Sequence, residues 1–248
     1  DISFLVPLGF KSSKNSKFDF SVRGWNRRPL NSKFLGWNSG DAVAQIYYQV
    51  FNSDKNSFGL NAGLRSVYSG QLSGGSTPIG EGSSLGFRWD HKLSNNSGFA
   101  IGAEQFIHFD NKTDTGRDIY FAYSKGKPLS KRNIYPILIF TGGIGTGYLA
   151  LWDKTKFACS DLFGGAGVDV NIYNQLCWGP FFSLSSLYNE KFSTFFEYNN
   201  YSFMIGGSLV PHNNTRITFG ITIAESFDDY KLKNFDELRW FTRISLSL

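Results

Sequence analysis

The chain has 248 residues, of which 17% are aromatic and 18% are charged, and its formal net charge is +5. This length suits one domain or one barrel. No stretch approaches the roughly 18 apolar residues of a transmembrane helix. The basic residues form neither a run nor a nucleic-acid-binding motif, so the sequence disfavours a helical membrane protein and a nucleic-acid partner.

The predicted elements are strands, because apolar and polar side chains alternate with a period of two. In the segment 84–93, for example, Leu85, Phe87 and Trp89 share one face, and the other face is polar or Gly. Such segments have roughly 9–13 residues, the length that a tilted strand needs to cross a bilayer. The predicted strands are 17–25, 42–51, 58–68, 84–93, 98–109, 117–125, 135–149, 161–173, 177–187, 200–210, 216–226 and 238–248.

The connections between these strands alternate in length. The short ones are 53–57, 95–97, 174–175 and 211–215, and the long ones are 26–40, 69–83, 110–116, 151–160, 189–199 and 227–237. Short turns at one end and long loops at the other are typical of a transmembrane barrel. We therefore predict an all-β fold, a transmembrane antiparallel up-and-down β-barrel of about 12 strands over residues 17–248. A soluble β-sandwich is the alternative, but the polar faces are rich in Gly, which weakens a solvent-exposed strand.

Residues 1–16 precede the predicted wall. Within them, Ile2–Phe10 is apolar on both faces. Counting this stretch as a strand would make the number of strands odd, whereas an even number places both ends of the wall on the short-turn side. We therefore expect 1–16 to be either a periplasmic lead-in or a segment inserted into the lumen.

The final predicted strand alternates without a break to the end of the chain. Its apolar face carries Leu238, Trp240, Thr242, Ile244, Leu246 and Leu248. With the other strands, this pattern resembles the bacterial outer-membrane β-barrel superfamily, whose insertion signal usually ends in Phe rather than the Leu found here. The resemblance implies the bacterial outer membrane as location, with its lipids and the barrel-assembly machinery as partners. The stretch Gly102–Phe106, followed by 110–118, also resembles uncharacterised cyanobacterial envelope proteins.

Charged side chains on the polar faces are the candidate site residues, because those faces would line the lumen. They are Arg23, Arg65, Arg88, Asp90, Glu104, His108, Asp118, Asp169, Arg239 and Arg243. A three-residue turn at 95–97 would place Arg88 directly opposite Glu104. Two interpretations stay open: the charges neutralise one another and fill the lumen, or they form a constriction that selects solutes.

Aromatic residues on the apolar faces are candidates for a membrane-interface girdle. We expect Trp89 and Trp178 near the short-turn end and Trp240 near the other end. The predicted strand 161–173 would separate Cys159 from Cys177 by more than the Cα distance that a disulfide tolerates. Both cysteines are therefore expected to be free thiols.

No catalytic residue, metal site or cofactor is predicted. His108 points into the lumen, whereas an outer-leaflet lipid hydrolase needs its His at the lipid face. The loop 110–118 lacks the residue order of a calcium loop. The first function hypothesis is a narrow, passive, porin-like channel for ions or small polar solutes. The alternative is a non-conducting accessory, receptor or anchoring barrel that binds a protein partner through its long external loops, and a lipid hydrolase ranks third.

Overall fold

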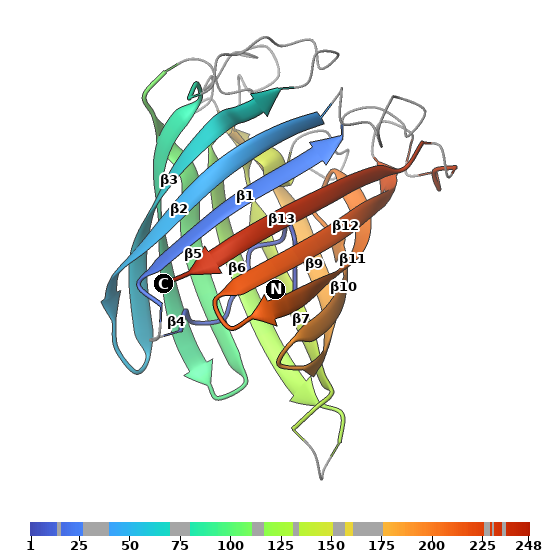
Figure 1. Cartoon of the computed structure of the whole chain (residues 1–248). Helices are drawn as coiled ribbons and strands as arrows, with labels where there is room; N and C mark the ends of the chain where they lie inside the picture. The colour runs from blue at the N-terminus through green and yellow to red at the C-terminus, as the bar shows by residue number, and fades with distance from the viewer. Residues whose placement is uncertain are drawn as a thin grey trace.

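The protein is a closed antiparallel β-barrel of 12 strands, with one extra strand, β8, beside the wall (Figure 1). The computed structural model describes residues 1–13, 16–26, 40–69, 80–110, 117–130, 134–150, 157–160, 176–225, 229, 231–234 and 237–248. The wall strands are β1 (Phe18–Asn26), β2 (Gly40–Asn52), β3 (Asn56–Ser69), β4 (Ser83–Ser94), β5 (Ser97–His108), β6 (Asp118–Pro128), β7 (Ile137–Gly145), β9 (Leu176–Asn189), β10 (Phe192–Tyr198), β11 (Ser202–His212), β12 (Thr215–Glu225) and β13 (Arg239–Ser247). The predicted fold class is confirmed.

The barrel closes where the first and last strands pair. β1 pairs with β13 in an antiparallel register that runs from Asp19 opposite Ser247 to Trp25 opposite Phe241. The short connections β2–β3, β4–β5, β9–β10 and β11–β12 lie at the same end as the start of β1 and the finish of β13. We refer to this end as the turn end and to the opposite end as the loop end.

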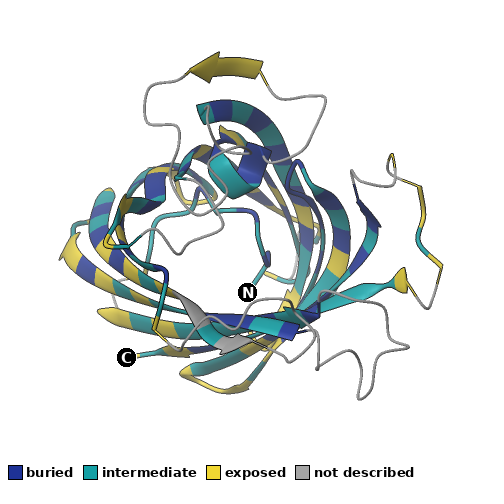
Figure 2. Cartoon of the chain, turned by 90° about the horizontal axis from the view of Figure 1, so that it is seen from above, coloured by how far each residue is buried: buried dark blue, intermediate teal, exposed yellow. Residues whose placement is uncertain are grey.

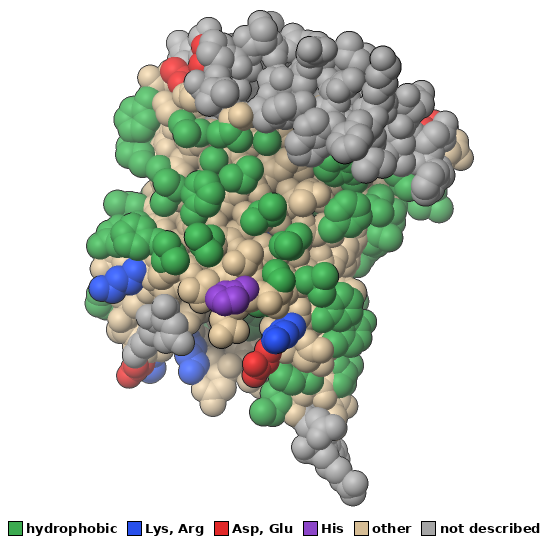
Figure 3. Space-filling view, in the orientation of Figure 1, with side chains coloured by type: hydrophobic (Ala, Val, Ile, Leu, Met, Phe, Trp, Pro, Cys, Tyr) green, Lys and Arg blue, Asp and Glu red, His purple; other side chains and the backbone are tan. Residues whose placement is uncertain are grey.

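The two faces of the wall differ in chemistry, as the alternation predicts. Phe121 and Ile205 are 41% and 44% exposed on the outer face, although both are large and apolar. Their strand neighbours Tyr120 and Met204 are buried on the inner face. On the side of the barrel shown in Figure 3, apolar side chains cover the middle of the wall, and described charged side chains lie mainly toward its two ends. Such a belt suits hydrocarbon rather than water.

The described residues include no helix with the length and apolarity to cross a membrane. One short 3-10 helix, η2 (Gly147–Ala150), follows β7 at the loop end. Leu149 of this helix is buried against Tyr120 and Phe181 of the wall. The helix therefore folds inward and narrows the loop end of the lumen.

One wall strand lies where the sequence analysis placed a loop. β10 falls within the range 189–199, and a two-residue turn separates it from β9. Its alternation is hidden because Phe195 is buried on the inner face directly beside the outward Phe196. The predicted strand 161–173 lies outside the described residues. In the wall, β7 pairs directly with β9, so no strand lies between these two.

The connection lengths also depart from the prediction at two places. At the loop end, only residues 199–201 join β10 to β11, and at the turn end residues 129–136 join β6 to β7. Asn199 makes the short corner possible, because its side-chain oxygen accepts hydrogen bonds from the Ser202 amide and hydroxyl at 2.8 and 3.1 Å. Loop length is therefore not strictly alternating around the barrel.

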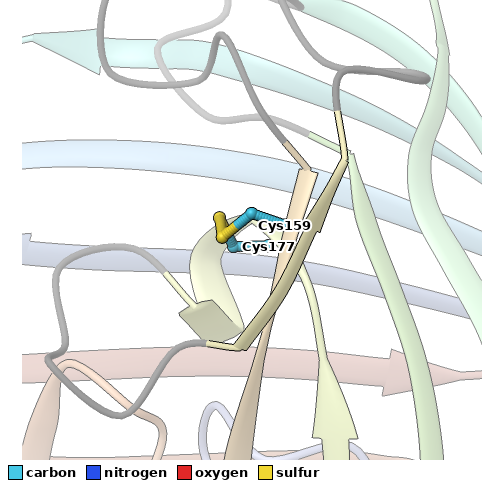
Figure 4. Close-up of a disulfide and its surroundings, with 2 residues drawn as sticks. All are labelled: Cys159 and Cys177. Atoms are coloured by element: carbon cyan, nitrogen blue, oxygen red, sulfur yellow. A yellow bond between two sulfur atoms is a disulfide. The ribbon is translucent and has the colours of Figure 1, made fainter.

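Cys159 and Cys177 form a disulfide (Figure 4), so the prediction of two free thiols is wrong. Their Cα atoms are 4.0 Å apart. β8 (Phe157–Ser160) runs antiparallel to the start of β9, with Ser160 opposite Leu176. The two cysteines are therefore neighbours on adjacent strands, and no wall strand separates them.

Candidate functional site

The segment that precedes β1 lies inside the barrel (Figure 2). We refer to residues 1–13 as the inner segment. Its main chain and side chains contact residues of β2, β4, β6 and the strands from β9 to β13. Most of these contacts are hydrogen bonds between the main chain of the inner segment and side chains of the wall.

Glu197 of β10 is the first anchor of the inner segment. Its side chain points into the lumen, and the residue is only 1% exposed. One carboxylate oxygen accepts hydrogen bonds from the Ser3 hydroxyl at 2.7 Å and the Phe4 amide at 2.9 Å, and the other accepts from the Leu5 amide at 2.9 Å. Charge-assisted bonds of this kind are stronger than bonds between neutral groups. A buried carboxylate is thus satisfied almost entirely by the inner segment.

Arg243 of β13 binds the same stretch through its carbonyl groups. The guanidinium donates to the carbonyl oxygens of Ser3 and Phe4 at 2.7 and 2.9 Å and to the Asp1 carboxylate at 2.9 Å. It also lies 5.1 Å from the centre of the Phe4 ring, within the range of a cation–π contact. Glu197 and Arg243 together fix the position of residues 3–5.

A second anchor, on β4, holds the other half of the inner segment. Arg88 donates to the carbonyl oxygens of Leu8 and Phe10 at 2.6 and 3.2 Å and to the carboxylate of Asp90. Asp90 in turn accepts bonds from the Ser12 hydroxyl at 2.7 Å and the Ser12 amide at 3.2 Å. Again, an arginine binds carbonyl groups of the segment while an adjacent carboxylate binds its donors.

Gly9 lies between the two anchors and touches the wall directly. Its amide donates to the Ser124 hydroxyl of β6 at 2.8 Å. A Cβ atom at this position would lie 2.5 Å from the Ser124 amide nitrogen and 2.8 Å from the Ala122 carbonyl oxygen. Main-chain atoms cannot give way to such an overlap, so only glycine permits this approach.

Apolar side chains of the inner segment fill two pockets. Phe4 is buried against Phe195, Met204 and Phe241, with its ring centre 5.7 Å from that of Phe241.

Val6 is buried in the second pocket, against Tyr120, Phe181 and Leu149. Leu149 belongs to η2, so the inner segment and the inward-folded helix meet in this pocket. The two pockets fix which residues of the segment face the wall.

A cavity of about 640 Å³ remains beside the inner segment. Its lining extends from Asn213, in the turn between β11 and β12, to Tyr148 of η2 at the loop end. The wall side of the cavity is largely polar. It is lined by Asp19, Ser21, Arg23, Gln45, Tyr47, Gln49, Asn61, Arg216, Ser245 and Ser247. A polar space therefore follows the length of the lumen along β13, β1, β2 and β3.

Opposite charges pair along this cavity. Arg216 of β12 bonds to the carboxylate of Asp19 across β13, and Asp19 also accepts from the Ser247 hydroxyl at 2.7 Å. Another nitrogen of Arg216 lies 3.6 Å from the Asp1 carboxylate, which also binds Arg243. Positive and negative side chains therefore lie next to one another along the cavity.

The predicted lumen residues fall into distinct places. Arg23 lines the cavity and is directly opposite Arg243 in the β1–β13 pair. Arg88 and Asp90 form the second anchor. The side chain of Arg65 and the whole of Asp169 lie outside the described residues.

The remaining predicted residues lie toward the loop end. Glu104 and Asp118 line the cavity and are opposite one another on β5 and β6. His108 is opposite Ser84 at the end of β5. Arg239 is 3.4 Å from the buried carboxylate of Glu225. In the loop 110–118, which lacks the residue order of a calcium loop, residues 111–116 lie outside the described part of the chain.

The predicted pair between Arg88 and Glu104 is wrong. Ser94 pairs with Ser97, so the β4–β5 turn has two residues rather than three, and Arg88 is opposite Gly102. The ladder shifts between Lys92 and Ser94, and a second shift between Leu85 and Phe87, where β5 contains a bulge, lies beyond Arg88. The carboxylate partner of Arg88 is instead Asp90, two residues along its own strand.

Of the three predicted girdle residues, Trp178 lies at the opposite end from the one expected. It follows the start of β9 at the loop end, where it is opposite Phe157 of β8. The long connection 146–175 precedes β9, where the sequence analysis predicts a two-residue turn. β9 therefore begins at the loop end rather than at the turn end. Trp240 lies near the start of β13 at the loop end, and Trp89 lies near the middle of β4.

Glu197 and Arg216 are site residues that the sequence analysis did not single out. The predicted strands place Glu197 in a loop, because they do not include β10. The period-two series Ser193, Phe195, Glu197 is the local signal that identifies it as inward-facing. Arg216 begins the inward series of β12, but the pattern alone does not reveal its reach across β13 to Asp19.

No protein-family model matches this chain, and no curated protein is detectably similar to it in sequence. Among solved structures, an outer membrane channel from Pseudomonas putida F1 matches with a TM-score of 0.52 at 9% identity, covering 99% of this chain and 100% of that chain. LpxR from Salmonella typhimurium matches with a TM-score of 0.37 at 10% identity, covering 93% of this chain and 100% of that chain. The outer membrane channel DcaP of Acinetobacter baumannii matches with a TM-score of 0.31 at 10% identity, covering 98% of this chain and 100% of that chain.

The first of these likenesses shows a shared fold. The chain has the closed barrel fold of an outer membrane channel, and the resemblance to outer-membrane β-barrels is confirmed at the level of fold.

Proposed function

We propose that the protein is a narrow, passive channel of the bacterial outer membrane for ions or small polar solutes. The observation that carries this proposal is the cavity of about 640 Å³, largely polar on its wall side, that follows the lumen from the turn end to the loop end. The apolar belt around the wall and the fold likeness to an outer membrane channel support it. Outer-membrane lipids would contact the belt, and the barrel-assembly machinery would insert the chain.

The size of the path follows from what already occupies the lumen. A wall of 12 strands encloses more space than side chains alone fill, and the inner segment takes up part of that space. What remains is lined on one side by Gln45, Gln49 and Asn61, whose amide groups replace hydration bonds of a passing solute. We therefore expect small solutes to pass and larger ones to be excluded.

Charge selectivity should be weak in the resting barrel. Arg216 is paired with Asp19, and Arg243 with Asp1, so neighbouring charges along the cavity offset one another. A permeating ion consequently meets alternating rather than uniform charge, which favours neither sign strongly.

Planar-bilayer recording from refolded protein tests the proposal. We expect discrete single-channel steps much smaller than those of an open general porin, with weak preference for anions or cations. A folded barrel that gives no steps at any applied voltage would contradict the channel function. That outcome would favour a non-conducting accessory, receptor or anchoring barrel, a second candidate suggested by the occupied lumen.

We further propose that the protein is not an enzyme. His108 lies opposite Ser84, a buried inner-face residue, whereas an outer-leaflet lipid hydrolase needs its His toward lipid. Phospholipid hydrolysis that is lost in His108→Ala would overturn this view.

A further inference from the structure

We propose that the interior of the barrel is a binding site for an extended peptide, which the inner segment occupies reversibly. When the inner segment leaves, the narrow cavity becomes a wider water-filled path. The second statement rests on the proposed channel function, and the first does not.

The wall recognises the inner segment mainly through its main chain. Glu197 binds two amides, while Arg243 and Arg88 each bind two carbonyl oxygens. Ser185 and Ser193 add bonds to the carbonyl oxygens of Ile2 and Asp1. Main-chain bonds of this kind supply affinity for an extended peptide without reading its sequence, as in other strand-binding proteins.

Two features of the site select the sequence of the bound peptide and fix its position along the lumen. Phe4 and Val6 enter separate apolar pockets. Gly9 passes the β6 main chain at a distance that excludes any side chain. An apolar residue, a second apolar residue two positions later and a glycine three positions after that therefore define the peptide that fits.

The chemistry of the site permits departure as well as binding. The groups that hold the segment are the charged side chains Glu197, Arg243, Arg88 and Asp90, together with hydroxyl groups. Water can bond to each of these groups and to the freed amides and carbonyls, so the net cost of breaking these bonds is only part of their strength. The two apolar pockets and the remaining advantage of the charge-assisted bonds oppose release, in contrast to a protein core in which nearly every contact is apolar.

The inner segment is tethered at the turn end. The amides of Lys17 and Phe18 both donate to the Leu248 carbonyl oxygen, at 2.8 and 3.0 Å. These bonds keep the start of β1 against the finish of β13 while residues 1–13 move. A released segment therefore remains attached at the turn end and leaves the lumen on that side.

The first experiment measures release without using conductance. Both cysteines of the chain are in the Cys159–Cys177 disulfide, so Val6→Cys supplies a single reactive thiol. In barrels reconstituted into vesicles, the rate of labelling by a charged, water-soluble maleimide reports exposure of the segment. Adding Glu197→Gln should raise that rate at least about tenfold, because a buried charge-assisted anchor is lost.

The matched control is Glu190→Gln, in the exposed turn just before β10, which should leave the labelling rate unchanged. Heat-modifiable migration in gels verifies that every variant retains a folded barrel. Should Glu197→Gln not fold, Gly9→Ala displaces the segment through its own main chain and leaves the wall intact.

The second experiment tests the peptide site itself. In Glu197→Gln or Gly9→Ala, single-channel steps should be larger than in the parent protein. For Gly9→Ala, whose wall is unaltered, a synthetic peptide with the sequence of residues 1–13 should restore the small steps. The peptide is added at about millimolar concentration, the effective concentration of a tethered segment. The same peptide carrying Gly9→Ala should have no effect.

The outcomes separate the two proposals. Faster labelling without conductance in any variant would remove the channel function and leave a releasable segment. Unchanged labelling in both Glu197→Gln and Gly9→Ala would overturn release, even if the parent protein conducts. Faster labelling with a peptide that restores nothing would overturn the peptide site.

Discussion

Glu197 and Arg243 bind complementary groups of the same three residues, the carboxylate taking the amides of Phe4 and Leu5 and the guanidinium taking the carbonyls of Ser3 and Phe4. Opposite charges from β10 and β13 thus act on one stretch of main chain. Neither charge is left unpaired in the lumen.

Asp19→Asn should shift the ion selectivity of the channel toward anions. The change removes the carboxylate that binds Arg216 beside the cavity. A unit charge about 4 Å from a permeating ion is worth about 1 kcal/mol in water, which corresponds to an approximately fivefold change in the permeability ratio. The reversal potential in a salt gradient measures this ratio. Glu190→Gln is the control, and an unaltered reversal potential in Asp19→Asn would show that ions do not pass Arg216.

Ile101→Lys should destabilise the barrel by about 2–4 kcal/mol, the cost of a lysine facing the middle of a bilayer. Ile101 is 38% exposed on the outer face, opposite Trp89 and Phe121. Urea unfolding in lipid vesicles provides the free energy. Asn96→Lys, in the β4–β5 turn, should remain within about 0.5 kcal/mol of the parent. A similarly small effect for Ile101→Lys would mean that water, not lipid, covers this face.

Gly143→Ala should damage the wall where β7 approaches β6. The added Cβ would lie 2.1 Å from the Phe121 carbonyl oxygen and 2.5 Å from the Phe181 ring. Overpacking of this kind costs about 1–3 kcal/mol, or more where main chain blocks relaxation. The yield of heat-modifiable barrel after refolding measures the effect.

Gly126→Ala is the matched control for that substitution, on the neighbouring strand β6. Its Cβ would be 3.5 Å from the nearest atom, a side-chain carbon of Ile137, which is an ordinary contact. We expect unchanged or slightly increased stability, because alanine restricts the unfolded chain more than glycine does. Equal losses in both variants would contradict the close approach at Gly143.

Cys159→Ser should lower stability and leave conduction unchanged. The disulfide joins residues 18 apart, and closing a loop of about that length contributes roughly 3 kcal/mol in the chain-entropy model. β8 pairs only with β9 among the described strands and is not part of the closed ring. Urea unfolding and single-channel recording test the two parts. Altered single-channel steps would show that β8 shapes the path.

The barrel was predictable because its two faces contact different media. Hydrocarbon selects large apolar residues outside, as at Ile101, and the crowded lumen selects small or polar residues inside, as at the adjacent Gly102. The resulting period of two is a local signal. It fails at β10 because Phe195 fills an internal pocket and therefore looks like an outward residue.

The site was less predictable, since its contacts join distant parts of the chain. Ser3 and Glu197, for example, are 194 residues apart. The register of β4 against β5 at Arg88 depends on the length of the turn and on a shift of the ladder between Lys92 and Ser94, which together place Arg88 opposite Gly102 rather than Glu104. An apolar stretch such as Ile2–Phe10 suits either a periplasmic lead-in or a segment in the lumen, so the sequence alone does not decide between them.

The inner segment contacts β2, β4, β6 and the strands from β9 to β13, so its partners come from both the early and the late part of the chain. The complete set exists only where these strands belong to one barrel. A chain without β13 would lack Arg243, and residues 3–5 would lose the guanidinium that binds their carbonyl groups.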